Sequence, residues 1–202
     1  MRQSPSAFAG LTEHLLFLRA MLRNPRSIGA IAPSSLYLAR RMVRGIAGAE
    51  QIVELGPGTG AFTREIVSRA GPGCRVLAVE TNRSFVERLQ LAWPQVDCVC
   101  ASAETLPALA AARGISRVDH IISGLPFASL PTETTRRILN GVHETLRVGG
   151  TFTTFQYVHA YGMTAAAGFR RELSARLGSG PHTHLVVRNN PPALVLTWRR
   201  LT

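Results

Sequence analysis

A short apolar strand that runs into a turn of alternating glycines constrains this chain more than any other feature. Residues 51–60 read Gln-Ile-Val-Glu-Leu-Gly-Pro-Gly-Thr-Gly, and a helical pattern begins at Ala61. In α/β folds, a strand, a glycine turn and a helix in this order bring bare backbone and a helix N-terminus up to a nucleotide-like ligand. The stretch therefore predicts a ligand site at the carboxyl end of a buried strand.

The pattern beyond this turn alternates between strands and helices, as βα units do. Strands are predicted at 51–55, 75–80, 96–100, 118–123, 151–157, 185–189 and 194–199, and helices at about 62–70, 82–93, 106–113, 131–146 and 163–177. The last two strands follow one another without a long helix between them. The order favours an α/β fold with a Rossmann-like, doubly wound, seven-stranded sheet that ends in an antiparallel hairpin.

Two extra helices are predicted ahead of this sheet. Residues 6–24 carry an apolar stripe at helical spacing together with arginines. This helix either covers the sheet or lies in a membrane interface with its apolar face down. A second helix begins at Pro33 and Ser34 or Ser35 and ends near Ile46, with Leu36, Ala39 and Val43 as its expected buried face.

The net charge of +11 lies mainly on the two ends of the chain. Residues 1–50 hold seven arginines against two acids, residues 159–202 hold six against one, and the middle is nearly balanced. A polyanion or an anionic membrane surface would be attracted to such ends, although a composition that uses arginine and no lysine also produces them. No apolar run is long enough to span a bilayer, no signal peptide is indicated, and the cysteines are not spaced like a metal site, so we expect a cytoplasmic protein without metal.

Two kinds of ligand are compatible with the glycine turn. Gly56, Gly58 and Ala61 satisfy the dinucleotide fingerprint G-x-G-x-x-A, and Glu80 suits recognition of ribose hydroxyls whichever ligand binds. A dehydrogenase is disfavoured because the turn follows two predicted helices and the chain leaves little room for a catalytic domain. An acid, Glu54, also stands two residues before the first glycine.

The whole string Glu54-Leu-Gly-Pro-Gly-Thr-Gly60 resembles motif I of the class I S-adenosylmethionine-dependent methyltransferases, E-x-G-x-G-x-G. The resemblance implies S-adenosylmethionine as cofactor, with S-adenosylhomocysteine as product. It implies that the turn wraps the methionine part, that Glu80 accepts from the ribose hydroxyls beside Thr81 and Asn82, and that a loop after the third strand holds the adenine. The implied cofactor-binding residues are Glu54, Gly56, Pro57, Gly58, Thr59, Gly60, Glu80, Thr81, Ser102, Ala103, Glu104 and Ser123.

The fourth strand ends in Ser123-Gly124-Leu125-Pro126-Phe127. Amine-methylating relatives carry (N/D)-(P/L)-P-(Y/F) here, and this chain has Gly124 in place of the Asn or Asp. Together with Leu22-Arg-Asn-Pro-Arg26, Ile28-Gly-Ala-Ile-Ala-Pro-Ser-Ser35 and Asn190-Pro-Pro-Ala, this block resembles bacterial phospholipid N-methyltransferases. The resemblance implies methylation of the amine of phosphatidylethanolamine, and of its mono- and dimethyl forms, towards phosphatidylcholine.

Residue roles follow from this resemblance and from the expected strand ends. Residues 1–48 would face the membrane and cover the substrate, and residues 49–202 would form the methyltransferase domain. Phe127 would face the amine as it gains charge. The catalytic candidates are Ser123, Gly124, Leu125, Pro126, Phe127, Tyr157 and His159, and the substrate-binding candidates are Ser34, Ser35, Tyr37, Arg40, Arg41, Arg44 and Tyr161.

The expected partners are a phospholipid and an anionic membrane surface, the latter bound through residues 1–24, on the inner face of the membrane. An RNA adenine N-methyltransferase is the main alternative, because the basic ends could bind phosphates. The chain lacks the basic platform interleaved with aromatics that a single-strand binder carries, which makes nucleic acid the weaker expectation. A non-catalytic adaptor with this fold is a third alternative, which the intact motif I disfavours.

Overall fold

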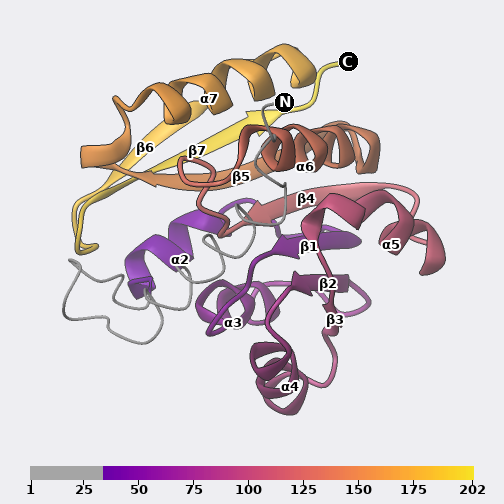
Figure 1. Cartoon of the computed structure of the whole chain (residues 1–202). Coiled ribbons are helices and arrows are strands. Elements are labelled where there is room, and N and C mark those ends of the chain that lie inside the picture. Colours follow the sequence, from indigo (N-terminus) through magenta and orange to yellow (C-terminus); the bar gives the residue numbers. More distant parts are fainter. Residues whose placement is uncertain (1–33) are drawn as a thin grey trace, which may run out of the picture. The chain divides into compact units, whose positions relative to one another are not determined.

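The strands form one mixed sheet in the computed structural model, which describes residues 34–202 (Figure 1). The strand order is β3-β2-β1-β4-β5-β7-β6. The strands are β1 Gln51–Leu55, β2 Arg75–Glu80, β3 Asp97–Cys100, β4 Val118–Ser123, β5 Leu146–Tyr157, β6 His182–Val186 and β7 Ala193–Arg199. β1 to β5 are parallel, whereas β7 runs antiparallel to both β5 and β6. The predicted seven-stranded α/β sheet with an antiparallel C-terminal hairpin is confirmed.

Helices cover both faces of the sheet (Figure 1). α2 Leu36–Met42, α3 Ala61–Val67 and α4 Arg83–Ala92 lie on one face, and α5 Leu106–Ala112, α6 Thr132–Thr145 and α7 Thr164–Leu177 on the other. Side chains alternate along each strand, so Ile52 of β1 packs towards the first group and Val53 towards the second. None of these helices, within residues 34–202, is long and apolar enough to cross a bilayer.

Strand boundaries agree with the sequence where an apolar run is sharply bounded, as in β1, β2 and β4. β5 starts earlier than residue 151, because Leu146 already pairs with Val118 before an irregularity in the register. β6 spans His182–Val186 and not residues 185–189, so that prediction was wrong. β6 is an edge strand whose first four side chains are exposed, and such a strand has no apolar alternation that would mark its ends.

Of the two predicted N-terminal helices, the one at 6–24 lies outside the described residues, and the second is α2. Its buried side chains are Leu38, Ala39, Met42 and Val43, while Leu36 is exposed. The prediction that Leu36 is buried was therefore wrong. Ser35 caps the helix by accepting from the Leu38 N–H, and the face that packs on α3 and on the β5–β7–β6 side of the sheet begins at Leu38.

An aromatic cluster fixes α7 against the sheet. Phe169 of α7 stacks on Phe127 with ring centroids 4.3 Å apart, and meets the fully buried Trp198 edge-on at 5.9 Å. Phe152 of β5 lies 6.2 Å from both Phe127 and Trp198. Because Phe127 follows β4, this cluster also holds the chain beyond β4 in place.

Replacing Phe169 by Ala should lower the free energy of unfolding by about 3–5 kcal/mol, because the ring is lost from a closely packed site. Urea denaturation followed by circular dichroism measures this change. The control is Leu91→Ala on α4, where the side chain is 84% exposed and the expected change is below about 0.5 kcal/mol. Equal stability of the two variants would contradict the packing role of Phe169.

Candidate active site

In the glycine turn between β1 and α3, one glycine is packed against neighbouring side chains and another has open space beside it. Gly58 and Gly60 have φ angles of 55° and 85°, which favour glycine. A Cβ on Gly60 would lie 2.5 Å from the Trp93 ring, whereas a Cβ on Gly58 would meet nothing within 4 Å. The turn is therefore packed against α4 at Gly60, and a ligand can approach its backbone at Gly58. Pro57 is buried and Thr59 is exposed.

The carboxylate of Glu80 ends β2 beside this turn. Its Oε2 accepts from the Gly58 N–H at 3.1 Å, and its Oε1 accepts from the Asn82 N–H at 2.9 Å and from the Thr81 hydroxyl at 3.4 Å. The turn and the end of β2 are thus joined through one acceptor. The structure brings Glu80, Thr81 and the turn together, as the sequence predicted.

Glu54 is a fully buried carboxylate on β1, directly before the turn. Its Oε2 accepts from the Thr63 hydroxyl of α3 at 2.7 Å, and its Oε1 has no hydrogen-bond partner among the described residues. Burial, opposed by the Thr63 bond, raises the pKa of Glu54 to about 8. The native state therefore holds the Glu54 proton more tightly than the unfolded chain does. The resulting contribution to the free energy of unfolding is fully present below about pH 4.5, and it is lost as the pH rises towards 8.

These residues fit a small ligand that carries a positive charge and a ribose. A cation beside Glu54 would supply the missing partner of Oε1 and favour the ionised carboxylate. Glu80 offers the acceptor oxygens that ribose hydroxyls need. The open side of Gly58 leaves space where the backbone would face such a ligand.

Residues 123–127 pack directly on the glycine turn. The Gly124 N–H donates to the Leu55 carbonyl at 2.8 Å, and a Cβ on Gly124 would lie only 2.7 Å from the Gly56 carbonyl oxygen. A Cβ on Gly56 would similarly lie 2.8 Å from Leu125 Cδ2. Ser123 is buried, and its hydroxyl accepts from the Leu125 N–H at 3.3 Å. The absence of Asn or Asp at position 124 thus has a steric reason: no side chain fits there.

Phe127 is a core residue in this structure. It is 5% exposed, and one face of its ring is covered by Phe169. This placement favours a packing role over the predicted contact with a substrate amine. Pro126, its neighbour, is half-buried, and its carbonyl accepts from the Ser129 N–H at 2.8 Å.

The segment after β3 has its own internal partners. Ser102 accepts from the Glu104 N–H at 3.2 Å and caps the 3₁₀ helix η1 Ala103–Thr105, in which Ala103 is buried. The Glu104 carboxylate lies 3.0 Å from Nε of Arg137 on α6. That ion pair gives Glu104 a role in joining η1 to α6, apart from the adenine contact predicted for it.

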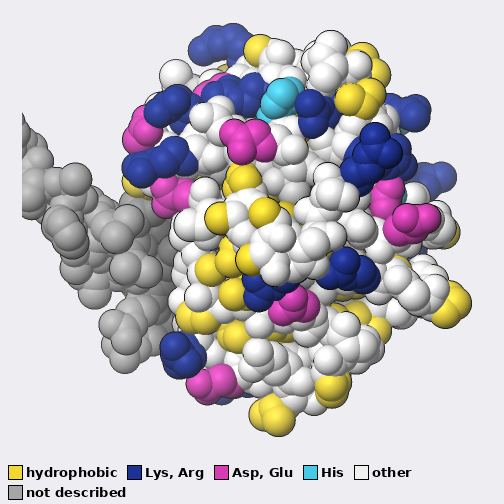
Figure 2. All heavy atoms as spheres, turned by 90° about the vertical axis from the view of Figure 1, so that its right-hand side faces the viewer, with side chains coloured by type: hydrophobic (Ala, Val, Ile, Leu, Met, Phe, Trp, Pro, Cys, Tyr) yellow, Lys and Arg dark blue, Asp and Glu magenta, His cyan; other side chains and the backbone are white. Residues whose placement is uncertain are grey.

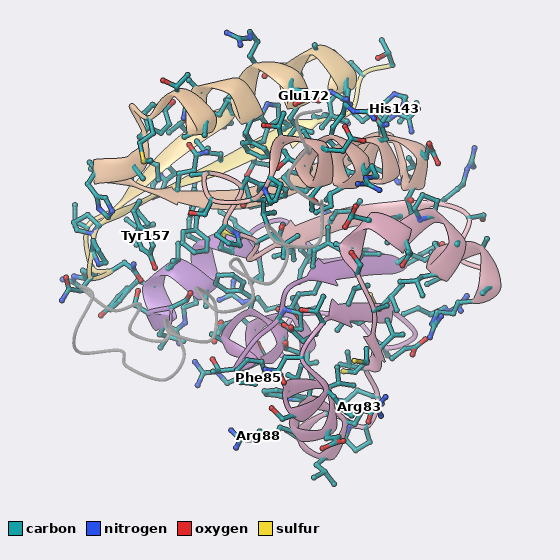
Figure 3. All side chains as sticks on the ribbon, viewed as in Figure 1. Arg83, Phe85, Arg88, His143, Tyr157 and Glu172 are labelled. Atoms are coloured by element: carbon teal, nitrogen blue, oxygen red, sulfur yellow. The ribbon has the colours of Figure 1, made fainter. Side chains whose placement is uncertain are left out.

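The residues after β5 lie at the same edge of the sheet as the turn, because β1, β4 and β5 are parallel. Tyr157, labelled in Figure 3, is half-buried, and burial raises the pKa of its phenol. Its ring stacks on the exposed His159, with ring centroids 5.7 Å apart. Tyr161 lies under the guanidinium of Arg170, 3.7 Å from Cζ to the ring centroid. These side chains therefore lie at or after the end of β5, at the edge of the sheet that also carries the glycine turn.

The substrate-binding candidates in and around α2 fall into two groups. Tyr37, Arg40 and Arg41 line one groove with β6, and Ser34, Ser35 and Arg44 are not part of its lining. Ser34 is half-buried, and the Ser35 hydroxyl caps its own helix. Arg40 lies 3.7 Å from Glu65, whereas Arg41 is half-buried and Arg44 is exposed. Tyr37 is 48% exposed, and its hydroxyl accepts from Arg188 at 3.1 Å.

Sequence reasoning missed several residues that complete the site. Thr63 holds Glu54, Trp93 packs against the turn, and Asn189 accepts from the Ser35 N–H at 2.9 Å. Thr63 stands on the first turn of the helix after the glycines, and this position was the available signal. Trp93 and Asn189 reach the site through tertiary packing, which the local pattern does not reveal.

The site can now be compared with known proteins. A family model described as a methyltransferase domain matches residues 52–150. An ornithine lipid N-methyltransferase of Singulisphaera acidiphila is 35% identical over 147 residues, which cover 70% of this chain and 77% of that protein. The chain belongs to the S-adenosylmethionine-dependent methyltransferases.

Solved structures share the fold of this methyltransferase. The 1,6-didemethyltoxoflavin-N1-methyltransferase of Burkholderia thailandensis, which holds S-adenosylhomocysteine, superposes with a TM-score of 0.70 at 18% identity, covering 100% of this chain and 94% of that one. An O-methyltransferase of Bacillus cereus gives 0.61 at 13% identity, covering 96% and 92%. The cofactor is S-adenosylmethionine. Glu54, the glycine turn and Glu80 remain the predicted residues for holding it, and their geometry fits such a ligand.

Replacing Gly124 by Ala should weaken S-adenosylmethionine binding about 5- to 150-fold, since a shift of the Gly56 carbonyl to relieve overpacking costs about 1–3 kcal/mol. Isothermal calorimetry measures this affinity. The control is Gly168→Ala on α7, where a Cβ meets nothing within 4 Å and the affinity should not change. Unchanged affinity in the Gly124 variant would contradict the proposed contact.

The raised pKa of Glu54 predicts that S-adenosylmethionine binding releases a proton. Below about pH 8 the free protein keeps this carboxyl protonated, and the positive ligand favours the ionised form. The affinity should therefore rise with pH between about 6 and 8, by at most about tenfold per unit. Calorimetry in buffers of different ionisation enthalpy measures the proton, and Glu54→Gln should abolish both effects. An affinity independent of pH in the wild type would contradict this assignment.

Proposed function

We propose that this methyltransferase N-methylates the headgroup amine of a membrane lipid. The proposed acceptor is phosphatidylethanolamine, with its mono- and dimethyl forms, towards phosphatidylcholine. The observation that carries the proposal is the 35% identity, over 70% of this chain, to a protein named as an ornithine lipid N-methyltransferase. Ornithine lipid is therefore the second acceptor to test, since both lipids present an amine.

The chemistry requires a neutral amine in line with an electrophilic methyl group, which S-adenosylmethionine supplies when bound. A lipid ammonium has a pKa close to that of lysine, so the site must exclude water and leave a path for the proton. Positioning supplies much of the acceleration. Residues 123–127 border the cofactor turn on the acceptor side, where the Gly56–Gly124 contact leaves no room for a side chain between them.

In this proposal, the proton lost by the lipid ammonium leaves the site through side chains at the end of β5. The Tyr157 phenol, whose pKa is raised by burial, keeps its proton and can only donate or accept a hydrogen bond. The exposed His159 imidazole stacks on Tyr157 at 5.7 Å. In the proposed reaction His159 takes the amine proton and passes it to water.

A lipid acceptor also places the enzyme at a membrane. The proposed location is the cytoplasm, with peripheral attachment to the inner face of the membrane through residues 1–24. Arginine side chains near an anionic surface add about 1 kcal/mol each to such attachment.

The test is transfer of label from S-adenosylmethionine. The full chain is incubated with phosphatidylethanolamine in detergent micelles, with ornithine lipid in the same micelles, and with RNA, and each fraction is extracted and counted. Label in phosphatidylethanolamine supports the proposal in full, and label in ornithine lipid alone corrects the headgroup. Label in RNA alone would establish the alternative, and label in none would overturn the proposed N-methylation of a lipid.

A variant pair shows that the label depends on the site. Glu80→Ala removes the acceptors for the ribose hydroxyls, and each such charged hydrogen bond contributes about 1.5–3 kcal/mol. Its affinity for S-adenosylmethionine should fall at least about tenfold, and incorporation at low cofactor concentration should fall with it. Glu87→Ala, an exposed position on α4, should behave as the wild type. Full affinity in Glu80→Ala would contradict the ribose assignment.

A further inference from the structure

Exposed apolar side chains gather at the end of the sheet that carries the site. Six of the nine large apolar side chains that are exposed in residues 34–202 belong to the start of α2, the segment after β5, or the end of β6. We call them the apolar rim: Leu36, Tyr37, Val158, Met163, Leu185 and Val187. Val187 is 67% exposed and Leu185 49%. Such a concentration of apolar surface marks an interaction site.

Hydrogen bonds hold the three segments of the rim together. The Val158 N–H donates to the Pro192 carbonyl at 3.0 Å, which joins the end of β5 to the β6–β7 turn. The Ser35 N–H donates to Asn189 Oδ1 at 2.9 Å, which joins the start of α2 to the same turn. Since β1, β4 and β5 are parallel, the rim lies at the edge where the glycine turn and residues 123–127 also lie (Figure 1).

A basic groove runs beside the rim between α2 and β6. It has a volume of about 350 Å³, and its lining includes Arg40, Arg41, His184 and Arg188 but no carboxylate. The Arg188 guanidinium lies 5.1 Å above the Tyr37 ring. Burial, together with the nearby charge of Arg44, lowers the pKa of Arg41, whereas Arg40 lies 3.7 Å from Glu65, which is outside the groove lining. In contrast, basic and acidic side chains are interspersed on the face shown in Figure 2.

The β6 side of the groove is too far from residues 123–127 to hold the phosphate of the lipid that is being methylated. Ser123 pairs with Thr154, Thr154 with Leu196, and Leu196 with Thr183 of β6. Three strand spacings make this separation about 14 Å. The nitrogen and phosphorus of an ethanolamine headgroup are four bonds apart, at most about 5 Å. An anion held at the β6 side of the groove, by His184 or Arg188, therefore belongs to another molecule.

We propose that the apolar rim and the basic groove dock on an anionic membrane, with the rim in the interface and the arginines at the headgroups of lipids other than the acceptor. This inference rests on the proposed function, because it turns the acceptor side of the site towards the bilayer. Apolar side chains bordered by arginines are what an interfacial surface requires. Aliphatic side chains such as Leu185 and Val187 suit a membrane better than RNA, which stacks its bases on aromatic rings.

The experiment measures sedimentation of the full chain with phosphatidylcholine vesicles that contain or lack phosphatidylglycerol. These lipids have no amine that can be methylated, so binding is measured apart from catalysis. The test variant is the double substitution Val187→Asp and Arg188→Gln. The matched control is Leu91→Asp with Arg88→Gln on α4, which lies away from Tyr157 and the end of β5 in Figure 3.

The test variant should bind phosphatidylglycerol vesicles about 30-fold more weakly, whereas the control pair should change binding less than about twofold. The test and control variants should both keep the wild-type melting temperature, the wild-type affinity for S-adenosylmethionine and the wild-type activity on lipid in micelles. Equal loss in both pairs, or wild-type binding by the test variant, would overturn the inference. So would a change of oligomeric state that accounts for the loss of vesicle binding. A protein that methylates lipid in micelles yet fails this vesicle test retains the proposed function and loses only the inference.

Discussion

The contact between the Gly56 carbonyl and Gly124 is the constraint on which the site depends. It joins the turn after β1 to the segment after β4, with 2.7 Å between the carbonyl oxygen and the position of a missing Cβ. The cofactor side and the acceptor side of the site therefore share one piece of backbone. Because glycine has no side chain, position 124 allows the two segments to touch.

Two carboxylates, Glu54 and Glu80, lie on either side of the turn that makes this contact. Glu54 keeps one carboxylate oxygen for Thr63 and leaves the other without a partner, and Glu80 ties Gly58 to the end of β2. A buried acceptor without a partner is costly to the free protein, and a positive ligand would remove that cost. The site thus has a built-in preference for a cationic ligand, consistent with the sulfonium and ammonium of S-adenosylmethionine.

Local sequence patterns predicted the sheet and the cofactor turn. They did not predict the roles of side chains whose contacts lie far away in the sequence. The bounds of β1, β2 and β4 were predicted because their apolar runs end sharply at glycine or polar residues. The predicted bounds of β6 were wrong because an exposed edge strand has no such pattern. The turn residues were predicted because backbone geometry demands glycine. The roles of Phe127, Glu104 and Arg40 depend on Phe169, Arg137 and Glu65, whose proximity follows only from the folded chain.

The position of β7 has a consequence for how this sheet is assembled. β7 follows every other strand in sequence, yet it lies inside the sheet, between β5 and β6, and contributes the fully buried Trp198. Until residues 193–199 leave the ribosome, β5 lacks one neighbour and β6 has none. The hairpin turn that bears the basic groove and part of the rim is therefore ordered last, so membrane attachment through it waits for a completed sheet. A partly synthesised chain would contain the cofactor turn before it could present this hairpin surface to a bilayer.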